Sequence, residues 1–442
     1  MKRLFAALVV GLSACVTGQA SAPVLSDEAR AHSMLQHGDS AGAVAIFERL
    51  AVEHPADLGL ARGLAEAHVK NGTGQALLDR LAATDTAQSH YARGLVLFSR
   101  SADASGPAVT EFRRAVELDP GQPEYSFRLG VALLESEKYD EAKASLTRAV
   151  AAAPERWSWL LPLAKAQHRT GDTRLATASI RAVIDHEPSE ADAKTAKALM
   201  EQIADPFVNF PRPAKAALEQ GLNWLQVADI PQQAIVQFEE ILHDYPDLAV
   251  VHALLGLAYS RVDDAGRAVD ELRRAVELAP DDGKNQLYLG ELYLGRQRAK
   301  QAKEHFEKAV EHNPTLATAW FHLADMALEK NELDEAHKAY FIASRLAPDD
   351  TNAHGKLALV YQLEGNWPAA DRELKAVLDK DADNVEFMLR LGVLHTERFT
   401  KAKNPAEKKE AAAEASKWLE KVIEAQPENA LASRALERVK RP

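Results

Sequence analysis

The sequence predicts an all-α solenoid, in which helical hairpins stack in a row and need no single central core. The first observation is a spacing, because three successive copies of one pattern end at Pro280, Pro314 and Pro348, which are equally spaced along the chain. The second is that side chains of the same size recur inside each copy. A leucine precedes a small residue, and an alanine, a bulky residue and a second alanine follow. These residues are Leu255, Gly256, Ala268, Leu272 and Ala275; Leu289, Gly290, Ala302, Phe306 and Ala309; and Leu323, Ala324, Ala336, Tyr340 and Ala343.

Each recurring residue has a physical reason to be where it is. Small side chains such as Gly256 and Ala268 allow the two helices of one copy to approach closely. The bulky residue, Leu272 in the first copy, is expected to fill the gap toward the next copy. Proline between two copies interrupts no internal helical hydrogen bond. The pattern therefore predicts two antiparallel helices in each period.

This pattern resembles the tetratricopeptide repeat, whose period is about 34 residues and whose unit is a helical hairpin. The resemblance implies a right-handed superhelical solenoid of about ten repeats. It also implies a concave groove, lined by the first helix (helix A) of each hairpin, that binds other proteins. In this family the second, fifth, ninth and twelfth positions of the repeat commonly meet the ligand.

The N-terminus reads as a lipoprotein signal peptide over residues 1–14. A charged start precedes the apolar run 4–10, which is too short to span a bilayer as a helix. Leu12-Ser13-Ala14-Cys15 then resembles the bacterial lipobox, and Cys15 is the one cysteine of the chain. The resemblance implies lipidation of Cys15. Because Val16 and not aspartate follows, it also implies the periplasmic face of the outer membrane.

An alternative cleavage site stays open at this end of the chain. Ala20-Ser21-Ala22 also fits a small-x-small signal-peptidase site. Cleavage after Ala22 would remove the cysteine and leave a soluble periplasmic protein.

Breaks in the repeat phase predict how the rest of the chain is divided. The predicted parts are a lipidated tether at 15–26, an N-terminal array with an end helix at 27–205, a proline-rich linker at 206–213, and a C-terminal array with a capping helix at 214–442. Three prolines between 206 and 213 cannot lie inside a helix, so the linker separates the two arrays.

The N-terminal array begins with one copy at 27–55 and a shortened copy at 56–88, which the turn signal Asn71-Gly72-Thr73-Gly74 interrupts. Regular copies then close at Pro120, Pro154 and Pro188. The segment 189–204 is predicted to form one helix without a partner, like the helix that caps the chain at 428–440.

The C-terminal array closes its copies at Pro246, Pro280, Pro314 and Pro348, and at Ala382 in place of a fifth proline. The last copy starts at Val385 and carries 11 extra residues within 398–413. This insert contains Lys401, Lys403, Lys408 and Lys409 in an otherwise acidic chain. It is either a solvated helix extension or a contact point for an acidic partner or lipid headgroups.

The candidate groove residues lie at the fifth and ninth positions of helix A. They are Phe127, Val131, Leu161, Lys165, Leu257, Leu287, Glu291, Phe321 and Asp325. The Lys, Asn and Arg set with which related proteins hold a chaperone's terminal carboxylate is missing. Two interpretations remain: a partly apolar groove for an extended peptide or partner helix, or residues that belong to the core.

No sequence motif for catalysis, metal binding or a cofactor is present, so the chain is predicted not to be an enzyme. His252, His322 and His354 are interpreted as surface or groove residues. The acidic pairs at 263–264, 281–282 and 349–350 are interpreted as helix N-caps, and the six tryptophans as packing residues.

Charge narrows the class of partner. A net charge of −12 argues against nucleic acid or a bare anionic membrane as the main partner. The sequence thus predicts a lipid-anchored scaffold that assembles other envelope proteins, of the pilus, secretion or exopolysaccharide type. The alternative is an accessory or substrate-binding subunit of an envelope enzyme, such as a peptidoglycan or polysaccharide machine.

Overall fold

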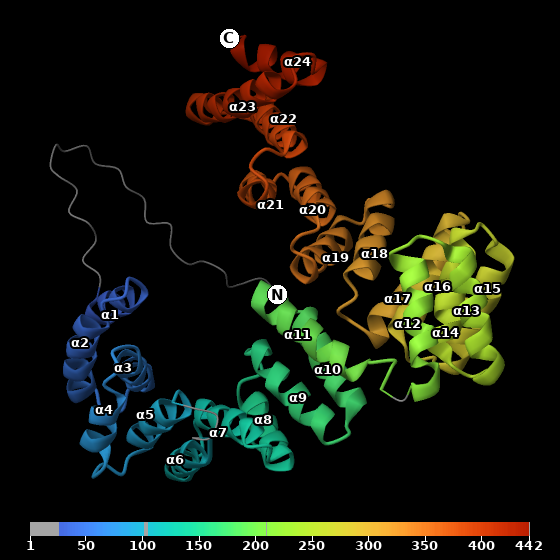
Figure 1. Ribbon diagram of the computed structural model, residues 1–442. Helices are drawn as coiled ribbons and strands as arrows, with labels where there is room; N and C mark the ends of the chain where they lie inside the picture. The colour runs from blue at the N-terminus through green and yellow to red at the C-terminus, as the bar shows by residue number, and fades with distance from the viewer. Residues whose placement is uncertain (1–25, 101–104, 209, 442) are drawn as a thin grey trace, which may run out of the picture. The chain divides into compact units, whose positions relative to one another are not determined.

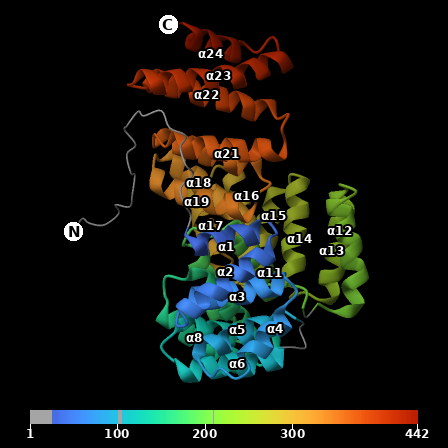
Figure 2. The ribbon, with the colours of Figure 1, turned by 90° about the vertical axis from the view of Figure 1, so that its left-hand side faces the viewer.

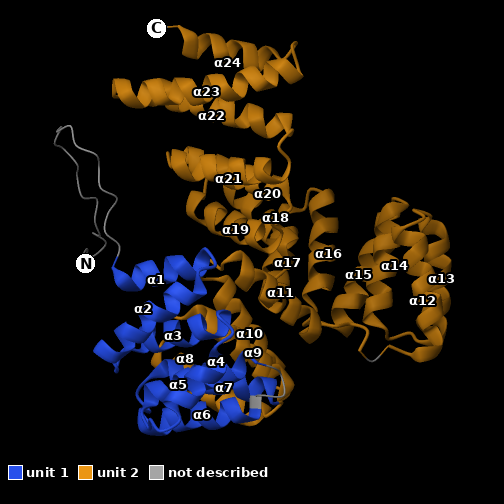
Figure 3. Cartoon of the chain, turned by 60° about the vertical axis from the view of Figure 1, so that its left-hand side comes forward, with its two compact units in different colours: residues 1–136 blue, residues 137–442 orange. Residues whose placement is uncertain are grey.

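The computed structural model describes residues 26–100, 105–208 and 210–441, and every regular element in these ranges is a helix (Figure 1). The chain divides into two compact units, residues 1–136 and 137–442 (Figure 3). The predicted leader and Cys15 lie outside the described residues. Within each unit the described helices follow one another as helical hairpins, with α11 and α24 as single helices, so the prediction of an all-α solenoid of tetratricopeptide-like repeats is confirmed.

The first unit contains seven helices within the described residues. They are α1 (Asp27–Gln36), α2 (Ser40–Glu53), α3 (Leu58–Lys70), α4 (Gly74–Leu81), α5 (Ala87–Phe98), α6 (Ser105–Leu118) and α7 (Pro123–Glu135). The shortened second copy is visible as α4, which has only eight residues.

The second unit begins with α8 (Tyr139–Ala152), the 3₁₀ turn η2 (Trp157–Trp159), α9 (Leu160–Arg169), α10 (Thr173–Ile184) and α11 (Glu190–Ile203). After the 3₁₀ turn η3 (Arg212–Ala214) come α12 (Lys215–Gln226), α13 (Pro231–Asp244), α14 (Ala249–Arg261), α15 (Ala265–Leu278), α16 (Gly283–Gly295), α17 (Ala299–His312), α18 (Ala317–Glu329) and α19 (Leu333–Leu346). The unit ends with α20 (Thr351–Leu363), α21 (Trp367–Lys380), α22 (Val385–Lys401), α23 (Pro405–Ala425) and α24 (Ala430–Lys440).

Helix starts in the second unit confirm the predicted N-caps. The side chains of Asp264, Asp282 and Asp350 accept hydrogen bonds from the backbone N–H groups of residues 267, 284 and 352. Each bond satisfies one of the amide donors that the first turn of a helix leaves without a partner.

The closing prolines have a second role besides ending a helix. In the C-terminal array, six residues after each of its four closing prolines, a ring or amide nitrogen lies within hydrogen-bonding distance of the proline's carbonyl oxygen. The four pairs are His252 with Pro246 (2.9 Å), Gln286 with Pro280 (3.5 Å), Trp320 with Pro314 (2.8 Å) and His354 with Pro348 (3.1 Å). The nitrogens recur once in each repeat period, so the loop between two hairpins is tied to the next hairpin in the same way each time.

The bulky residue of each copy packs inside its own hairpin. A Cβ placed on Gly256 would lie 2.7 Å from the side chain of Leu272, and one on Gly290 would lie 2.7 Å from Phe306. The prediction that these residues fill the gap toward the next copy is therefore incomplete. They lie directly over the small residue of helix A, which explains why that position is small.

Helix α11 is a single helix, as predicted, but its packing extends beyond its own array. It packs against α9 and α10 and also against α19 of the C-terminal array. Its Ala193 and Ala196 are fully buried, and Met200 is 2% exposed. The ion pairs of Lys338 with Asp185 (3.1 Å) and of Arg345 with Glu190 (3.6 Å) join the same two regions.

The outer face of α19 differs from the matching faces of α15 and α17. It carries Phe341 and Ile342, and Ile342 is 1% exposed. One and two periods earlier the same positions are charged and exposed: Glu307 and Lys308, and Arg273 and Arg274. The apolar pair therefore accounts for the position at which α11 packs. The predicted linker at 206–213 lies inside the second unit, and its role as a domain boundary stays a prediction.

The insert in the last copy lengthens α22 and α23 to 17 and 21 residues. Helix α24 packs against both of them (Figure 2), as the predicted capping helix should. No helix in the described part of the chain is long enough and apolar enough to cross a membrane.

Candidate functional site

The candidate groove residues fall into two groups in the structure. Leu257, Glu291, Phe321 and Asp325 are partly exposed on consecutive first helices α14, α16 and α18. We call the surface of α14, α16, α18 and α20 on which the ninth-position residues lie the first-helix face. Leu287 of the same series is only 7% exposed and belongs to the hydrophobic core, which is the second of the two interpretations of these residues.

The candidates in the earlier helices are also divided. Leu161 on α9 is 5% exposed and is core, again as the second interpretation has it. Lys165 on the same helix is exposed, one turn further on. Phe127 and Val131 lie on α7 in the first unit, and both are partly exposed. The fifth position therefore points into the core in some hairpins, whereas the ninth position reaches the surface.

Asp325 is the best-defined polar group of the first-helix face. Its carboxylate accepts a hydrogen bond from the Tyr340 hydroxyl at 2.5 Å and another from the Lys356 ammonium at 3.0 Å. Burial, followed by this hydrogen bond, raises the pKa of Tyr340. The tyrosine therefore stays a neutral donor at physiological pH, and Asp325 stays bound on one side while its other side faces solvent.

The polar row continues with His322 on α18, the helix of Asp325, and with Glu291 on the neighbouring first helix α16. The His322 ring nitrogen lies 3.7 Å from the Glu291 carboxylate. The imidazole also stacks on the buried Phe306 ring, with centroids 4.7 Å apart, and meets Phe321 edge-on. Its orientation is thus fixed by aromatic contacts from two helices.

Sequence reasoning missed one member of this row. Leu359 on α20 is 39% exposed and comes one repeat period after Asp325. Continuing the series Leu257, Glu291 and Asp325 by one step would have found it. The first-helix face is therefore a row of leucine, glutamate, aspartate and leucine, with acidic groups between two apolar ones.

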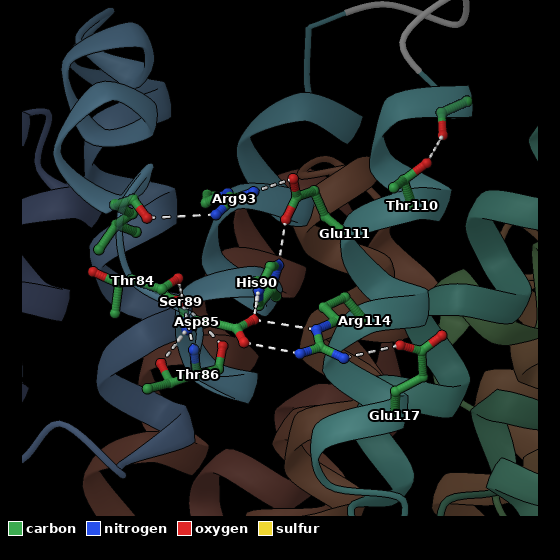
Figure 4. A network of polar contacts seen from close by, with 12 residues as sticks. Thr84, Asp85, Thr86, Ser89, His90, Arg93, Thr110, Glu111, Arg114 and Glu117 are labelled. Atoms are coloured by element: carbon green, nitrogen blue, oxygen red, sulfur yellow. Dashed lines mark hydrogen bonds and ion pairs between the residues drawn. The ribbon is translucent and has the colours of Figure 1, made fainter.

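A second polar network joins α5 to α6 in the first unit (Figure 4). The two ring nitrogens of His90 lie 2.8 Å from Asp85 and 2.6 Å from Glu111. Each carboxylate also holds an arginine, Arg114 on Asp85 at 2.8 Å and Arg93 on Glu111. Hydrogen bonds from Arg114 and then His90 lower the pKa of Asp85 to about 2.

This network fastens two helices and is not arranged for catalysis. Both ring nitrogens of His90 are engaged by carboxylates, so neither is open to a substrate. Both carboxylates that contact His90 also bind an arginine: Asp85 binds Arg114, and Glu111 binds Arg93. None of these groups is therefore placed to take a proton from a substrate.

His354 is predicted to lie at the surface or in the groove, and that prediction is wrong. It is 4% exposed, with one ring nitrogen 2.8 Å from Glu373 and the other on the Pro348 carbonyl. His252 makes the matching contacts to Glu271 (2.6 Å) and Pro246. Both act as ties between a hairpin and the preceding loop.

Two further findings concern the other predicted features. Trp159, Trp320 and Trp418 are buried, as packing residues should be. The described residues contain no group of three or more His, Cys, Asp or Glu side chains that could hold a metal ion.

Two tetratricopeptide-repeat family models match the chain. One covers residues 133–200 and 293–360, and the other covers residues 103–156 and 253–315. The matches fall in both of the predicted arrays.

Curated relatives match over parts of the chain. Human superkiller complex protein 3 is 26% identical over 283 residues, which are 56% of this chain and 18% of that protein. Human protein O-mannosyl-transferase TMTC3 is 30% identical over 172 residues, 38% of this chain and 17% of that protein. Tetratricopeptide repeat-containing protein trd-1 of Caenorhabditis elegans is 24% identical over 31% of this chain and 17% of its own length. The chain spans less than a fifth of each of these proteins.

Solved structures also match parts of the chain. The tetratricopeptide-repeat protein YrrB is 22% identical with a TM-score of 0.39, and the match covers 45% of this chain and 97% of YrrB. Pseudomonas aeruginosa pilF is 16% identical with a TM-score of 0.41, covering 50% of this chain and 95% of pilF. With the repeat period, the paired helices and the matches to two family models, the chain belongs to the tetratricopeptide-repeat family.

Proposed function

We propose that this protein is a non-enzymatic scaffold whose first-helix face binds an extended segment of a partner protein. Proteins of this family generally mediate protein–protein interactions. The observation that carries the proposal is the row Leu257, Glu291, Asp325 and Leu359, one partly exposed side chain from each of four consecutive hairpins. An extended peptide presents side chains and backbone groups at regular intervals, so a row at regular spacing fits it.

The chemistry of the row defines the partner segment. Its two leucines favour apolar side chains at the ends of the segment. The carboxylates of Glu291 and Asp325 favour N–H groups or a basic side chain in the middle of the segment, because an ionised carboxylate accepts hydrogen bonds and donates none. Asp325 already binds Tyr340 and Lys356, so its position is fixed before the partner arrives.

For the cellular setting we propose the periplasmic face of the outer membrane, with a lipid on Cys15 as the anchor. The support is the sequence around Cys15, and acyl chains add about 0.8 kcal/mol of membrane affinity for each buried methylene. The partners would be envelope proteins of a pilus, secretion or exopolysaccharide system. The second candidate, an accessory subunit of an envelope enzyme, uses the same face.

The binding face is tested in the full-length protein with Glu291→Lys and Leu359→Asp combined. The control combines Asp270→Lys and Leu175→Asp, which change the same types of residue at exposed sites on second helices. Affinity purification from envelope extracts should lose the partner with the first pair and keep it with the control. Recovery of secretin or pilin components supports the scaffold, and recovery of a synthase or hydrolase supports the accessory subunit. Equal capture of the partner by both variants would contradict the proposal that the first-helix face binds it.

The anchor is tested separately with Cys15→Ala. The variant should leave the membrane pellet, and the wild-type protein should take up labelled palmitate. A wild-type protein that stays unlabelled, together with a variant that stays in the pellet, would refute lipidation.

A further inference from the structure

The C-terminal repeat differs in charge from the rest of the chain. Residues 385–442 contain twelve lysines and arginines against nine acidic residues, a net charge of +3 in a chain of −12. A pocket of about 340 Å³ lies in this repeat, between α22, α23 and α24. Its lining residues are Phe399, Lys408, Arg434, Glu437, Arg438 and Arg441.

Three of the four cations come from one face of a single helix. Arg434, Arg438 and Arg441 are spaced by four and three residues along α24 and its C-cap, so they lie on the same side. Glu437 is the one acid of the lining, and it pairs with Arg441 at 3.3 Å. Arg434 and Arg438 make no ion pair within the described part of the chain, whereas the nearby Lys440 pairs with Glu420 at 2.8 Å.

The fourth cation comes from the opposite wall. The Lys408 ammonium lies 4.9 Å from the centre of the Phe399 ring, which holds it over the pocket. Cations at the end of α24 complement the helix dipole, and that alone could explain the arginines. It cannot explain Lys408, which lies in the first turn of α23, where the dipole disfavours a positive charge.

We propose that this pocket binds a phosphate group, either as a free anion or on an anionic lipid headgroup. Arg434 and Arg438, which no described acid engages, offer fork-shaped pairs of N–H donors that match phosphate oxygens. Lys408 adds a point charge from the other side, and Phe399 supplies an apolar floor. The site is distinct from the first-helix face, because it is built from α22, α23 and α24 and shares none of its residues.

The test uses the full chain with Cys15→Ala, so that no lipid anchor contributes to membrane binding. One arm measures sedimentation with phosphatidylcholine vesicles, with and without phosphatidylglycerol. The other arm titrates inorganic phosphate by calorimetry. The test variant is Arg434→Gln with Arg438→Gln. The matched control is Lys417→Gln with Lys421→Gln, which removes the same charge from α23, where both lysines lie over Trp418 and outside the pocket.

The expected result is saturable binding in at least one arm. The arginine variant should weaken it about tenfold or more, and the lysine control should leave it within about twofold. Binding to phosphatidylglycerol vesicles identifies a lipid headgroup, and binding to phosphate alone identifies a soluble anion. Absence of binding in both arms overturns the proposal, as does an equal loss in both variants, which would indicate net charge only. Circular dichroism of both variants confirms that the helices are intact.

Discussion

Gln297 has a left-handed backbone conformation, with a φ of +60°, in the turn between α16 and α17. The same conformation recurs in the matching turns of the neighbouring repeats, at Asp229, Asp263, Asn331 and Gly365. Only glycine adopts it without steric cost, because a Cβ approaches the following carbonyl. Most hairpins of the C-terminal array thus accept strain at one residue of the turn.

Replacing Gln297 by glycine should therefore stabilise the protein, by about 0.5–1 kcal/mol once the added freedom of the unfolded chain is subtracted. The reverse change, Gly365→Ala, should destabilise it by at least as much, because nothing else in the turn changes. Urea denaturation of both variants checks the pair. A stability unchanged in both would mean that the turn conformation carries no strain.

Glu373 gives a prediction about pH. Burial alone would raise the pKa of its carboxyl, but the hydrogen bond from His354 and the charges of Arg345 and His354 outweigh burial and lower it. Because the pKa is lowered in the folded state, this carboxylate stabilises the fold at pH values above 4.5, which is its ordinary pKa. That contribution disappears as the pH falls from this value through the lower pKa of the folded state.

Glu373→Gln should cost about 1–3 kcal/mol at pH 7, since a charged hydrogen bond is lost in a buried place. The Glu373→Gln variant should also lose less stability than the wild type as the pH falls below 4.5. Asp379→Asn, an exposed change on the same helix, is the control. Parallel pH dependence of unfolding in the wild type and Glu373→Gln would contradict the prediction.

The candidate site shows what a sequence can predict at this scale. Spacing alone places Leu257, Glu291 and Asp325 on successive first helices, because the repeat period fixes their register. It cannot separate Phe321, which is partly exposed, from the buried Leu287 at the same repeat position. Their exposure depends on the sizes of neighbouring side chains from other helices, and the period does not encode these.

At the scale of the element, the recurring small residue decides how closely two helices approach. Ala302 on α17 is fully buried, in the same hairpin as the contact of Gly290 with Phe306. Ala302→Leu should destabilise the second unit by about 1–3 kcal/mol, because the interior has no space for three more carbon atoms. Lys300→Leu, at an exposed position of the same helix, should leave stability nearly unchanged. Equal denaturation midpoints in the two variants would show that the repeat phase is misplaced.

Helix boundaries are the most predictable features of the elements, because prolines, aspartate caps and left-handed turns each mark an end. The partner of α11 is harder to predict for a different reason. The segment resembles the capping helix at 428–440, whereas it also packs against α19, about 150 residues away in the sequence. The apolar pair Phe341 and Ile342, at positions that are charged in α15 and α17, is the available signal.

At the scale of the whole molecule, two features act in opposite directions on the predicted seam at 206–213. The proline-rich linker interrupts helical packing along the chain. Meanwhile α11, from the array before the linker, packs on α19 in the array after it. Stability in repeat proteins is roughly a sum over repeats and their interfaces, so the packing of α11 on α19 should contribute most to keeping the arrays together.

A protease site inserted after Val208, which is 75% exposed, allows the chain to be cut in its folded state. After the cut, the two pieces should still migrate together in size-exclusion chromatography at micromolar concentration, held by α11 on α19. Adding Ile342→Glu should separate them, because a charge would replace a side chain that is 1% exposed. Lys308→Glu, at the matching exposed position of α17, should leave them associated. Pieces that part while Ile342 is intact would mean that the linker is the main connection and that the arrays are separate domains. Pieces that stay together with Ile342→Glu would mean that contacts other than α11 on α19 hold the arrays.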